Sequence, residues 1–417
     1  MKTLTAPVLP ANRVAMLDTL RGFALFGILM VNMQFFHDPM MAFMFGFPET
    51  ATGADKVSIL LIKFLFMGKF YVIFSLLFGY GITIFLSKTL TSGVSILPVL
   101  RRRLGVLLLI GVLHFVLLWT GDILVYYAIF GFVLLLFIKV SNKGLVKWSI
   151  WLVSISIVLS TLLVLLIRMA MQILEAAPSF DASYAEAVRT LQNMMENVAR
   201  IYSSGTYKEM VSMRLHDIQF LALIVPFVLP MVLPMFILGL IGGRKQLIEN
   251  YSDHLPFFRK SMWVGLSVGL PSSLLLVYAF LNINQMPMVV FSVLYSIGSS
   301  LGGIFMGLFY ISTLVLLASK NKLKTFSAWI SPVGKMALTN YLLHSIICTT
   351  IFYGYGFGLI GQIGAFQGVL LAIVIFIVQI PLSRFWLSRF YYGPFEWLWR
   401  TLTYGKAQPF VKKNLLH

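Results

Sequence analysis

The segment DTLRGFALFGILMVNMQFFH, residues 18–37, decides the fold class of this chain. Asp18 and Arg21 stand at its start, Asn32 and His37 stand near its end, and no Asp, Glu, Lys or Arg follows Arg21 within it. A bilayer core about 30 Å thick is crossed by about 20 predominantly apolar residues in helical conformation. The segment is therefore predicted to be a transmembrane helix with polar groups at both ends.

Nine further apolar runs follow the first, and together they predict an all-α integral membrane protein. The runs fall at residues 64–87, 104–119, 121–139, 148–174, 218–242, 261–281, 288–318, 333–353 and 366–384. The composition agrees, because 59% of the 417 residues are apolar and 11% are charged, unlike a soluble domain. We expect a bundle of about ten transmembrane helices in a single polytopic domain, residues 1–417. No small-residue cleavage site follows the first run, so it is expected to stay as a helix.

The distribution of charge predicts the orientation of this bundle. Lys and Arg are concentrated in alternate connections: Lys2 and Arg13; Lys88, Arg101, Arg102 and Arg103; Lys139, Lys143 and Lys147; Arg244, Lys245, Arg259 and Lys260; Lys320, Lys322 and Lys324; and the tail from Arg384 to Lys413. By the positive-inside rule both termini are cytoplasmic, in a multi-pass protein of the plasma membrane. This placement explains the net charge of +18 without a nucleic-acid partner, and it favours contact with anionic membrane lipids.

The remaining connections are acidic and are predicted to face outward. Six of the fourteen acidic residues fall between residues 175 and 217, the one long extramembrane loop. Within it, residues 184–202 carry apolar side chains at helical spacing and predict an amphipathic helix, either lying on the membrane or serving as a spacer. Residues 385–417 are expected to form a cytoplasmic C-terminal tail.

Ionisable groups at the cytoplasmic ends of the first and third helices are candidates for binding an anion. Asp18 and Arg21 are three residues apart and are expected to pair on one helix face. One interpretation is an interfacial anchor. The other is that Arg21, together with Arg101, Arg102 and Arg103, receives the phosphates of a cytosolic ligand, because guanidinium groups match phosphate geometry.

A second set of polar residues falls in the middle to outer half of the membrane, where such groups are costly and default to functional candidates. The candidate catalytic residues in this layer are His344, His114, His37, Asn32 and Asp122, and Asn340 and Tyr341 are candidate substrate-site residues. Histidine is the usual general base near neutral pH. Interhelical hydrogen bonding without catalysis is the alternative explanation.

Near the C-terminus Glu396 lies among tryptophans, with Arg400 four residues later. An ion pair between them is expected from this spacing, and both are candidate substrate-site residues. The single cysteine, Cys348, excludes an internal disulfide and a cysteine-rich metal centre. No metal-binding motif is present, so no metal is predicted.

Several of these stretches resemble a known family. Residues 13–32, 74–79, 121–124, 336–341 and 393–400 look like the YeiB-type family of bacterial membrane proteins. More distantly, Asp18, Arg21, Gly22 and Asn32 are similar to the start of heparan-α-glucosaminide N-acetyltransferase, in which an Asn and a following His serve acetyl transfer. Gly334, Tyr341 and His344 resemble the late motif of polysaccharide O-acyltransferases, which place a histidine where Asn32 stands here. The resemblance implies an acyltransferase-like bundle.

These observations lead to three hypotheses. The first is a membrane acyltransferase that moves an acyl group from cytosolic acyl-CoA, for example acetyl-CoA, to a glycan, lipid or small molecule on the outer side. The second is a small-molecule or lipid transporter with a midplane polar site, in which a helix carrying Pro226, Pro230 and Pro234 is a gate. The third is a structural or immunity-type protein that binds its partner through the outer loop. A homodimer is compatible with each.

Overall fold

The computed structural model describes residues 15–37, 47–48, 50–92, 96–176, 186, 197–283 and 285–412. Apart from an isolated bridge between Phe390 and Val411, the regular structure of these residues is helical. The helices are α1 Ala15–His37, α2 Gly53–Leu61, α3 Lys69–Ser92, α4 Leu97–Leu117, α5 Leu124–Leu134, α6 Asn142–Ala176, α8 Tyr207–Arg244, α9 Leu255–Leu281, α10 Met288–Ser319, α11 Lys324–Lys335, α12 Ala337–Phe352, α13 Ala365–Arg389 and α14 Pro394–Tyr404. Short π and 3₁₀ turns cover Ile62–Phe66, Leu135–Phe137 and Tyr251–His254.

The chain is a multi-pass helical membrane protein. Six described segments are long and apolar enough to cross a bilayer: Ala15–His37, Gly53–Ser87, Asn142–Leu162, Tyr251–Leu281, Val289–Ser319 and Ala365–Arg389. Three shorter apolar helices occupy Leu124–Phe137, Val228–Arg244 and Ala337–Phe352. The helical membrane fold is thus confirmed, whereas ten crossings remain a prediction.

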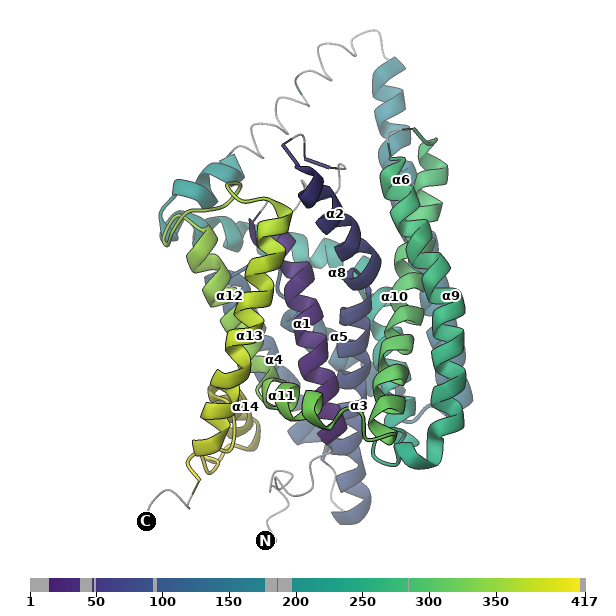
Figure 1. The fold of residues 1–417 in the computed structure, drawn as a ribbon, viewed down its shortest axis with the longest axis vertical. Coiled ribbons are helices and arrows are strands. Elements are labelled where there is room, and N and C mark those ends of the chain that lie inside the picture. The colour runs from purple at the N-terminus through teal and green to yellow at the C-terminus, as the bar shows by residue number, and fades with distance from the viewer. Residues whose placement is uncertain are drawn as a thin grey trace.

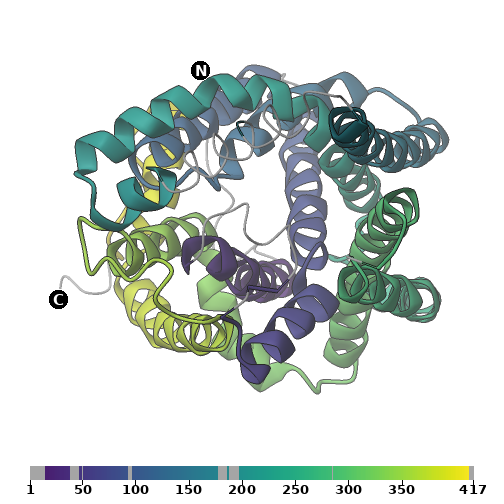
Figure 2. The same ribbon diagram turned by 90° about the horizontal axis from the view of Figure 1, so that it is seen from above.

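Helix α1 is the central element of the bundle (Figures 1 and 2). It packs against α3, α11, α12 and α13, and Leu20, Ala24, Leu25 and Leu29 are completely buried. Its close contact with α11 depends on Gly22 and Gly334. A Cβ on Gly334 would collide with the carbonyl oxygen of Asp18, and a Cβ on Gly22 with that of Ile330. This explains why glycine follows Arg21 in the opening segment.

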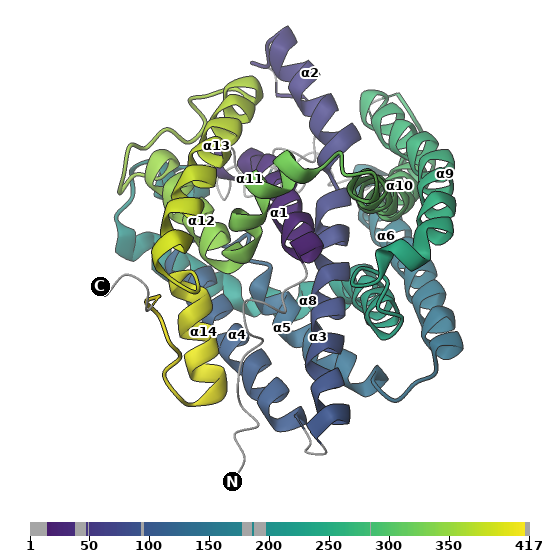
Figure 3. The ribbon, with the colours of Figure 1, turned by 60° about the horizontal axis from the view of Figure 1, so that its bottom comes forward.

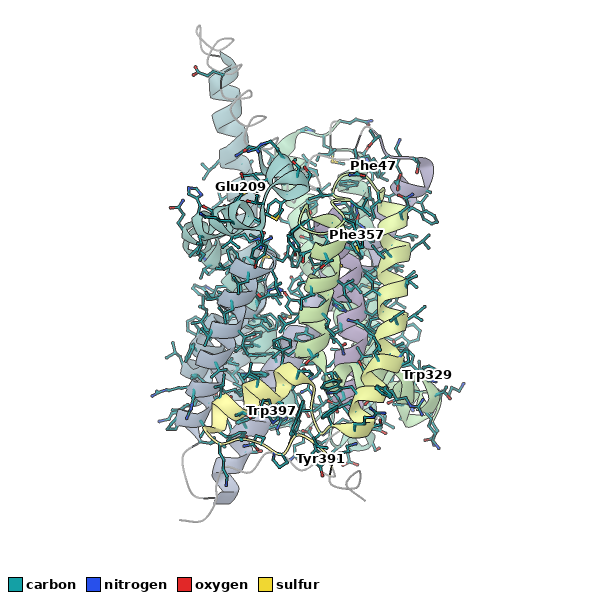
Figure 4. All side chains as sticks on the ribbon, turned by 90° about the vertical axis from the view of Figure 1, so that its left-hand side faces the viewer. Phe47, Glu209, Trp329, Phe357, Tyr391 and Trp397 are labelled. Carbon is teal, nitrogen blue, oxygen red and sulfur yellow. The ribbon has the colours of Figure 1, made fainter. Side chains whose placement is uncertain are left out.

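The two ends of the bundle differ in character. Helix α1 begins, and α14 lies, at the end that is lower in Figure 1; we call this the basic end, because Arg21, Arg103 and Arg400 belong to it. Figure 4 shows Trp329, Tyr391 and Trp397 there, and Phe47, Glu209 and Phe357 at the opposite end. Aromatic side chains at both ends are typical of the two interfaces of a membrane protein.

Two helices differ from the predicted runs. The run 333–353 is divided at Met336 between α11 and α12. The run 64–87 contains a break at Gly68, which adopts a φ of +84°, a conformation that favours glycine, and α3 begins at Lys69. The buried Lys69 ammonium donates to the Lys63 carbonyl over 2.9 Å.

Two further regions lie outside most of these runs, the predicted C-terminal tail and the long outer loop. In the predicted tail, residues 385–417, α13 continues to Arg389 and α14 packs against α4. In the loop 175–217 the structure describes a helical segment at 197–204, where Tyr202 is buried against Tyr353. Most of the predicted amphipathic helix 184–202 lies outside the described residues.

Candidate functional site

A cavity of about 350 Å³ opens inside the basic end of the bundle. Figure 3 turns this end toward the viewer, with α1, α3, α4, α11 and α14 around it. Its walls are mostly apolar and include Leu25, Ile28, Phe74 and Leu107. The charged side chains that line it are Asp18, Arg21, Arg103, Glu249, Lys335, Glu396 and Arg400. The cavity therefore combines an apolar interior with charged groups at the basic end.

The predicted pair at the start of α1 is present and lines this cavity. Arg21 Nη1 donates to Asp18 Oδ1 over 2.9 Å, with 27% of the Arg21 side chain exposed and 2% of the Asp18 side chain. The second carboxylate oxygen of Asp18, Oδ2, is buried and has no hydrogen-bond partner among the described residues. Asp18 therefore orients Arg21 and keeps an acceptor oxygen for a further donor.

Of the three consecutive arginines of α4, only Arg103 lines the cavity. Its guanidinium stacks 3.7 Å from the ring of Trp399 and 4.8 Å from that of Phe85. Trp399 Nε1 also donates to the Arg103 carbonyl over 2.9 Å, so α14 fixes the position of this arginine. Arg101 and Arg102 are exposed on other faces of the helix; for them, the prediction of a shared anion site fails.

Glu396 begins α14 and forms a cap on the start of α12. Its Oε1 accepts from the backbone N–H groups of Leu338 at 2.6 Å and Thr339 at 3.1 Å, and its Oε2 accepts from the Thr339 hydroxyl at 2.6 Å. A carboxylate satisfies free N–H groups at a helix N-terminus and complements the helix dipole. The sequence predicted an ion pair between Glu396 and Arg400. In the structure the Glu396 carboxylate binds the start of α12, and the Arg400 guanidinium lies 4.6 Å from the centre of the Tyr392 ring.

Glu249 is a third carboxyl group of the cavity, half-buried in the connection after α8. It accepts a hydrogen bond from the Tyr80 hydroxyl. Burial raises the pKa of Glu249 and the pKa of Glu396 above their usual values. With four cationic side chains, Arg21, Arg103, Lys335 and Arg400, the described lining is net positive.

The cavity is also lined by Tyr341, Ile123 and Tyr127. Ile123 N donates to the Tyr341 hydroxyl over 3.2 Å. On the far side of Tyr341 lies His114, with ring centroids 5.3 Å apart. His114 Nδ1 is 2.8 Å from Asp122 Oδ1, and His114 Nε2 is 2.7 Å from Ser345 Oγ. The structure thus unites three predicted residues, His114, Asp122 and Tyr341, with a serine that sequence reasoning missed.

His344 belongs to a different network, between α12 and α13. Its Nε2 lies 2.7 Å from Gln379 Oε1, and Asn340 Nδ2 donates to Ser383 Oγ over 3.0 Å. Both pairs are buried and repeat at the i,i+4 spacing of each helix. Such paired amides and hydroxyls hold helices together in a membrane, so for His344 the geometry favours the alternative explanation.

Asn32 and His37 do not line the cavity. Asn32 is half-buried, one turn beyond Ile28 on the face of α1 that carries Asp18, Arg21 and Leu25. His37 is buried at the opposite end of the helix, where its carbonyl accepts from Gly361 N over 2.7 Å. Asn32 and His37 were expected in one polar layer with His114 and His344. The structure instead places His37 at the end of α1, about one turn beyond Asn32.

His37 adjoins a second cavity, of about 420 Å³, at the opposite end. It is lined by Gln34 of α1, by residues around the start of α2 and by residues 361–367. Among the described lining residues, Asp55 is the charged one. Its carboxylate accepts hydrogen bonds from Thr52 and from Phe366 N. The buried Gln34 Nε2 has no hydrogen-bond partner among the described residues, so it can donate to a bound group.

Sequence reasoning missed Ser345, Gln379, Lys335 and Glu249. Ser345 adjoins His344, but a serine in a membrane helix usually bonds to its own backbone and carries no signal. Lys335 falls within the apolar run 333–353 and Glu249 between two runs, and neither was a candidate. Only the packing of α11 and of the α8–α9 connection brings them to the cavity. The available signal for Gln379 was its position as a polar residue inside the apolar run 366–384.

Comparison with known proteins places these features in a family. Residues 242–406, which include α9 to α14, match the model of a protein of unknown function, DUF418. The chain is 34% identical over 98% of both chains to "Uncharacterized protein YxaH" of Bacillus subtilis (strain 168). It is 28% identical to "Uncharacterized protein YeiB" of Escherichia coli (strain K12), over 97% of this chain and 99% of YeiB.

A third relative is the "Uncharacterized 39.9 kDa protein in amylase 3'region" of Bacillus acidopullulyticus, 26% identical over 98% of this chain and 99% of the relative. No solved structure matches the chain. Because the similarity to YxaH and YeiB extends over nearly the whole length of each protein, the chain belongs to the DUF418 family of YeiB-type membrane proteins.

Proposed function

We propose that the protein is a membrane acyltransferase that takes an acyl group from cytosolic acyl-CoA and delivers it to an acceptor on the outer side of the plasma membrane. In this proposal the basic end faces the cytoplasm, both termini are cytoplasmic, and the chain crosses the membrane ten times. Each of the ten apolar runs in the sequence falls largely on helices of the structure, and the charge asymmetry favours this orientation.

The observation that carries the proposal is the cavity of the basic end. A nucleotide with several phosphates requires cations at the mouth, and Arg21, Arg103, Lys335 and Arg400 supply them. Guanidinium groups bind phosphate through paired, charge-assisted hydrogen bonds. The apolar walls beyond them suit an acyl chain and the thioester arm that carries it.

The depth of the site fits an extended donor. His114 follows Arg103 by eleven residues on α4, a rise of about 16 Å along the helix. A pantetheine arm bound with its phosphates at Arg103 extends along this direction and brings the thioester toward Tyr341. His114 then lies close to the reacting carbonyl, with Asp122 holding Nδ1 and leaving Nε2 as the basic nitrogen.

The cavity of the opposite end suits the acceptor. Its described lining contains no Lys or Arg and includes the Asp55 carboxylate, the Gln34 amide and the hydroxyls of Thr50 and Thr52. These groups bind hydroxyl or amine donors better than anions. The acceptor in this proposal is therefore an uncharged or cationic molecule that carries hydroxyl or amino groups.

Binding of acyl-CoA to the purified protein in detergent or nanodiscs tests the proposal. Arg103→Gln and Arg400→Gln each remove one charge from the cavity, and Arg101→Gln removes the same charge from an exposed position two residues from Arg103. Loss of a charge-assisted contact worth about 1.5–3 kcal/mol raises Kd roughly 10- to 100-fold. We expect this increase for the two cavity variants and no change for Arg101→Gln.

Each of three experimental outcomes would contradict the proposal. Wild-type protein that binds and hydrolyses no acyl-CoA of any chain length would rule out the donor. Solute uptake into proteoliposomes without a donor, lost in His344→Ala, would select the transporter. Loss of function on deletion of 180–210, with an intact bundle, would select a binding partner of the outer loop.

A further inference from the structure

Ser345, His114 and Asp122 form a continuous chain of hydrogen bonds. Ser345 Oγ is 2.7 Å from His114 Nε2, and His114 Nδ1 is 2.8 Å from Asp122 Oδ1. Asp122 Oδ2 accepts from Val125 N over 2.7 Å, which fixes the carboxylate at the start of α5. An ionised Asp122 binds the Nδ1–H tautomer, so the Nε2 lone pair faces the serine hydroxyl. This is the arrangement that activates a serine nucleophile.

The hydroxyl of Ser345 differs from its neighbours on α12. Thr349 and Thr350 donate to carbonyls of their own helix, those of Ser345 and Ile346, over 2.7 Å each, as hydroxyls in membrane helices usually do. Ser345 instead directs its hydroxyl to a histidine on α4. All three members of the chain are buried, with 1% to 3% exposure, in an interior that strengthens each polar interaction.

Ser345 lies next to a residue of the cavity of the basic end. It is one turn beyond Tyr341 on α12, and Tyr341 lines that cavity. The two cavities have no described lining residue in common. A donor and an acceptor bound in these separate cavities would exchange the acyl group through an intermediate carrier.

We propose that Ser345 is this carrier, a nucleophile that holds the acyl group as an ester between two half-reactions; the proposal rests on the function proposed above. Ser345 Oγ attacks the thioester carbonyl as its proton passes to His114 Nε2. The C–S bond breaks, and the thiol leaves with the proton from His114. An acceptor hydroxyl or amine then attacks the ester, gives its proton to His114 and leaves as the acylated product, and Ser345 regains the proton.

Tyr341 stabilises the negative charge that develops on the carbonyl oxygen in both half-reactions. Its hydroxyl oxygen accepts from Ile123 N, so its own hydrogen remains to be donated. Tyr341 is one of the residues that line the cavity proposed for the thioester. A donor directed at a developing oxyanion is a main source of rate enhancement in acyl transfer.

A fluorophosphonate probe tests the nucleophile without any acyl donor. The full-length protein in nanodiscs is incubated with an alkyl fluorophosphonate, and the modified residue is located by mass spectrometry. We expect modification of Ser345 in the unaltered chain, none at this position in Ser345→Ala, and labelling at least about 100-fold slower in Asp122→Asn, which holds His114 in the wrong tautomer. Ser383→Ala is the matched control, because Ser383 is equally buried but bonds to Asn340.

Incubation with radiolabelled acyl-CoA and no acceptor tests the ester itself. We expect acyl-Ser345, released by hydroxylamine, in wild-type protein. An unlabelled Ser345, or acyl transfer that persists in Ser345→Ala, overturns the covalent carrier but leaves the acyltransferase in place. Labelling of Ser345 by the probe, without acyl-CoA binding, supports the nucleophile and overturns the donor instead.

Discussion

Replacement of Glu396 is the most direct test of how α14 holds the site together. In Glu396→Ala the N–H groups of Leu338 and Thr339 and the Thr339 hydroxyl lose the three hydrogen bonds described above. Each buried group left without a partner costs about 1–3 kcal/mol. Because Glu396 lines a cavity that water can enter, the low end applies to each bond. The total is about 3 kcal/mol.

Thermal unfolding of the purified protein measures this loss, and a decrease in Tm on the order of 3–4 °C is expected for a chain of 417 residues. Glu209 provides the matched control, because it caps the start of α8 through the same kind of bond, from Thr206 N over 2.7 Å, but at an exposed position. Glu209→Ala is therefore expected to change Tm much less. Equal decreases for the two variants would show that burial of Glu396 does not matter and would refute the reasoning.

The pH dependence gives a second, independent check. Burial raises the pKa of Glu396 from its ordinary value of 4.5 and outweighs the bonds that favour the charged form. Folding therefore favours the protonated group, whose stabilising contribution is complete below pH 4.5 and declines as pH rises through the raised pKa. Glu396→Gln does not titrate, so the Tm of wild type relative to this variant should fall as pH rises from about 4.5. A relative Tm that rises over this range would refute a raised pKa.

Two further predictions concern the packing of α1 and the role of His344. Gly334→Ala places a methyl group against the Asp18 carbonyl; we expect a loss of about 1–3 kcal/mol and weaker donor binding in a titration, whereas Gly105→Ala on open helix surface should change neither. His344→Ala should lower Tm by removing the bond to Gln379 but leave acyl-CoA affinity unchanged, because His344 does not line the donor cavity; a tenfold loss of affinity would assign it to the site.

Much of the candidate site could be predicted from local sequence. Asp18 and Arg21 were predicted to pair because residues three apart share a helix face, and they do so. His114, Asp122 and Tyr341 were selected because polar groups are costly in a membrane interior, and the structure unites them. The first argument uses the geometry of a single helix, and the second uses the cost of polar groups in a bilayer. Neither requires knowledge of which helices pack together.

Other assignments failed because they depend on helix rotation. Arg101, Arg102 and Arg103 are equivalent in sequence, but successive residues are turned by about 100° on a helix, so only Arg103 meets the cavity. The three histidines were likewise indistinguishable. His114 has an aspartate and a serine as partners, whereas His344 has a glutamine, and each partner comes from a distant part of the chain or from an adjacent loop.

By itself the sequence determined that this is a helical membrane protein, and it predicted a basic and an acidic side, because hydrophobic length and charge placement act segment by segment. The first segment alone also predicted the Asp18–Arg21 pair, from the spacing of the two residues on one helix face. Tertiary structure decided which side chains meet: the cap of Glu396 on α12, the cavity lined by Arg103 and Arg400, and the contact between Ser345 and His114, 231 residues apart. Such contacts depend on the rotation and depth of helices packed against one another, which no single segment encodes.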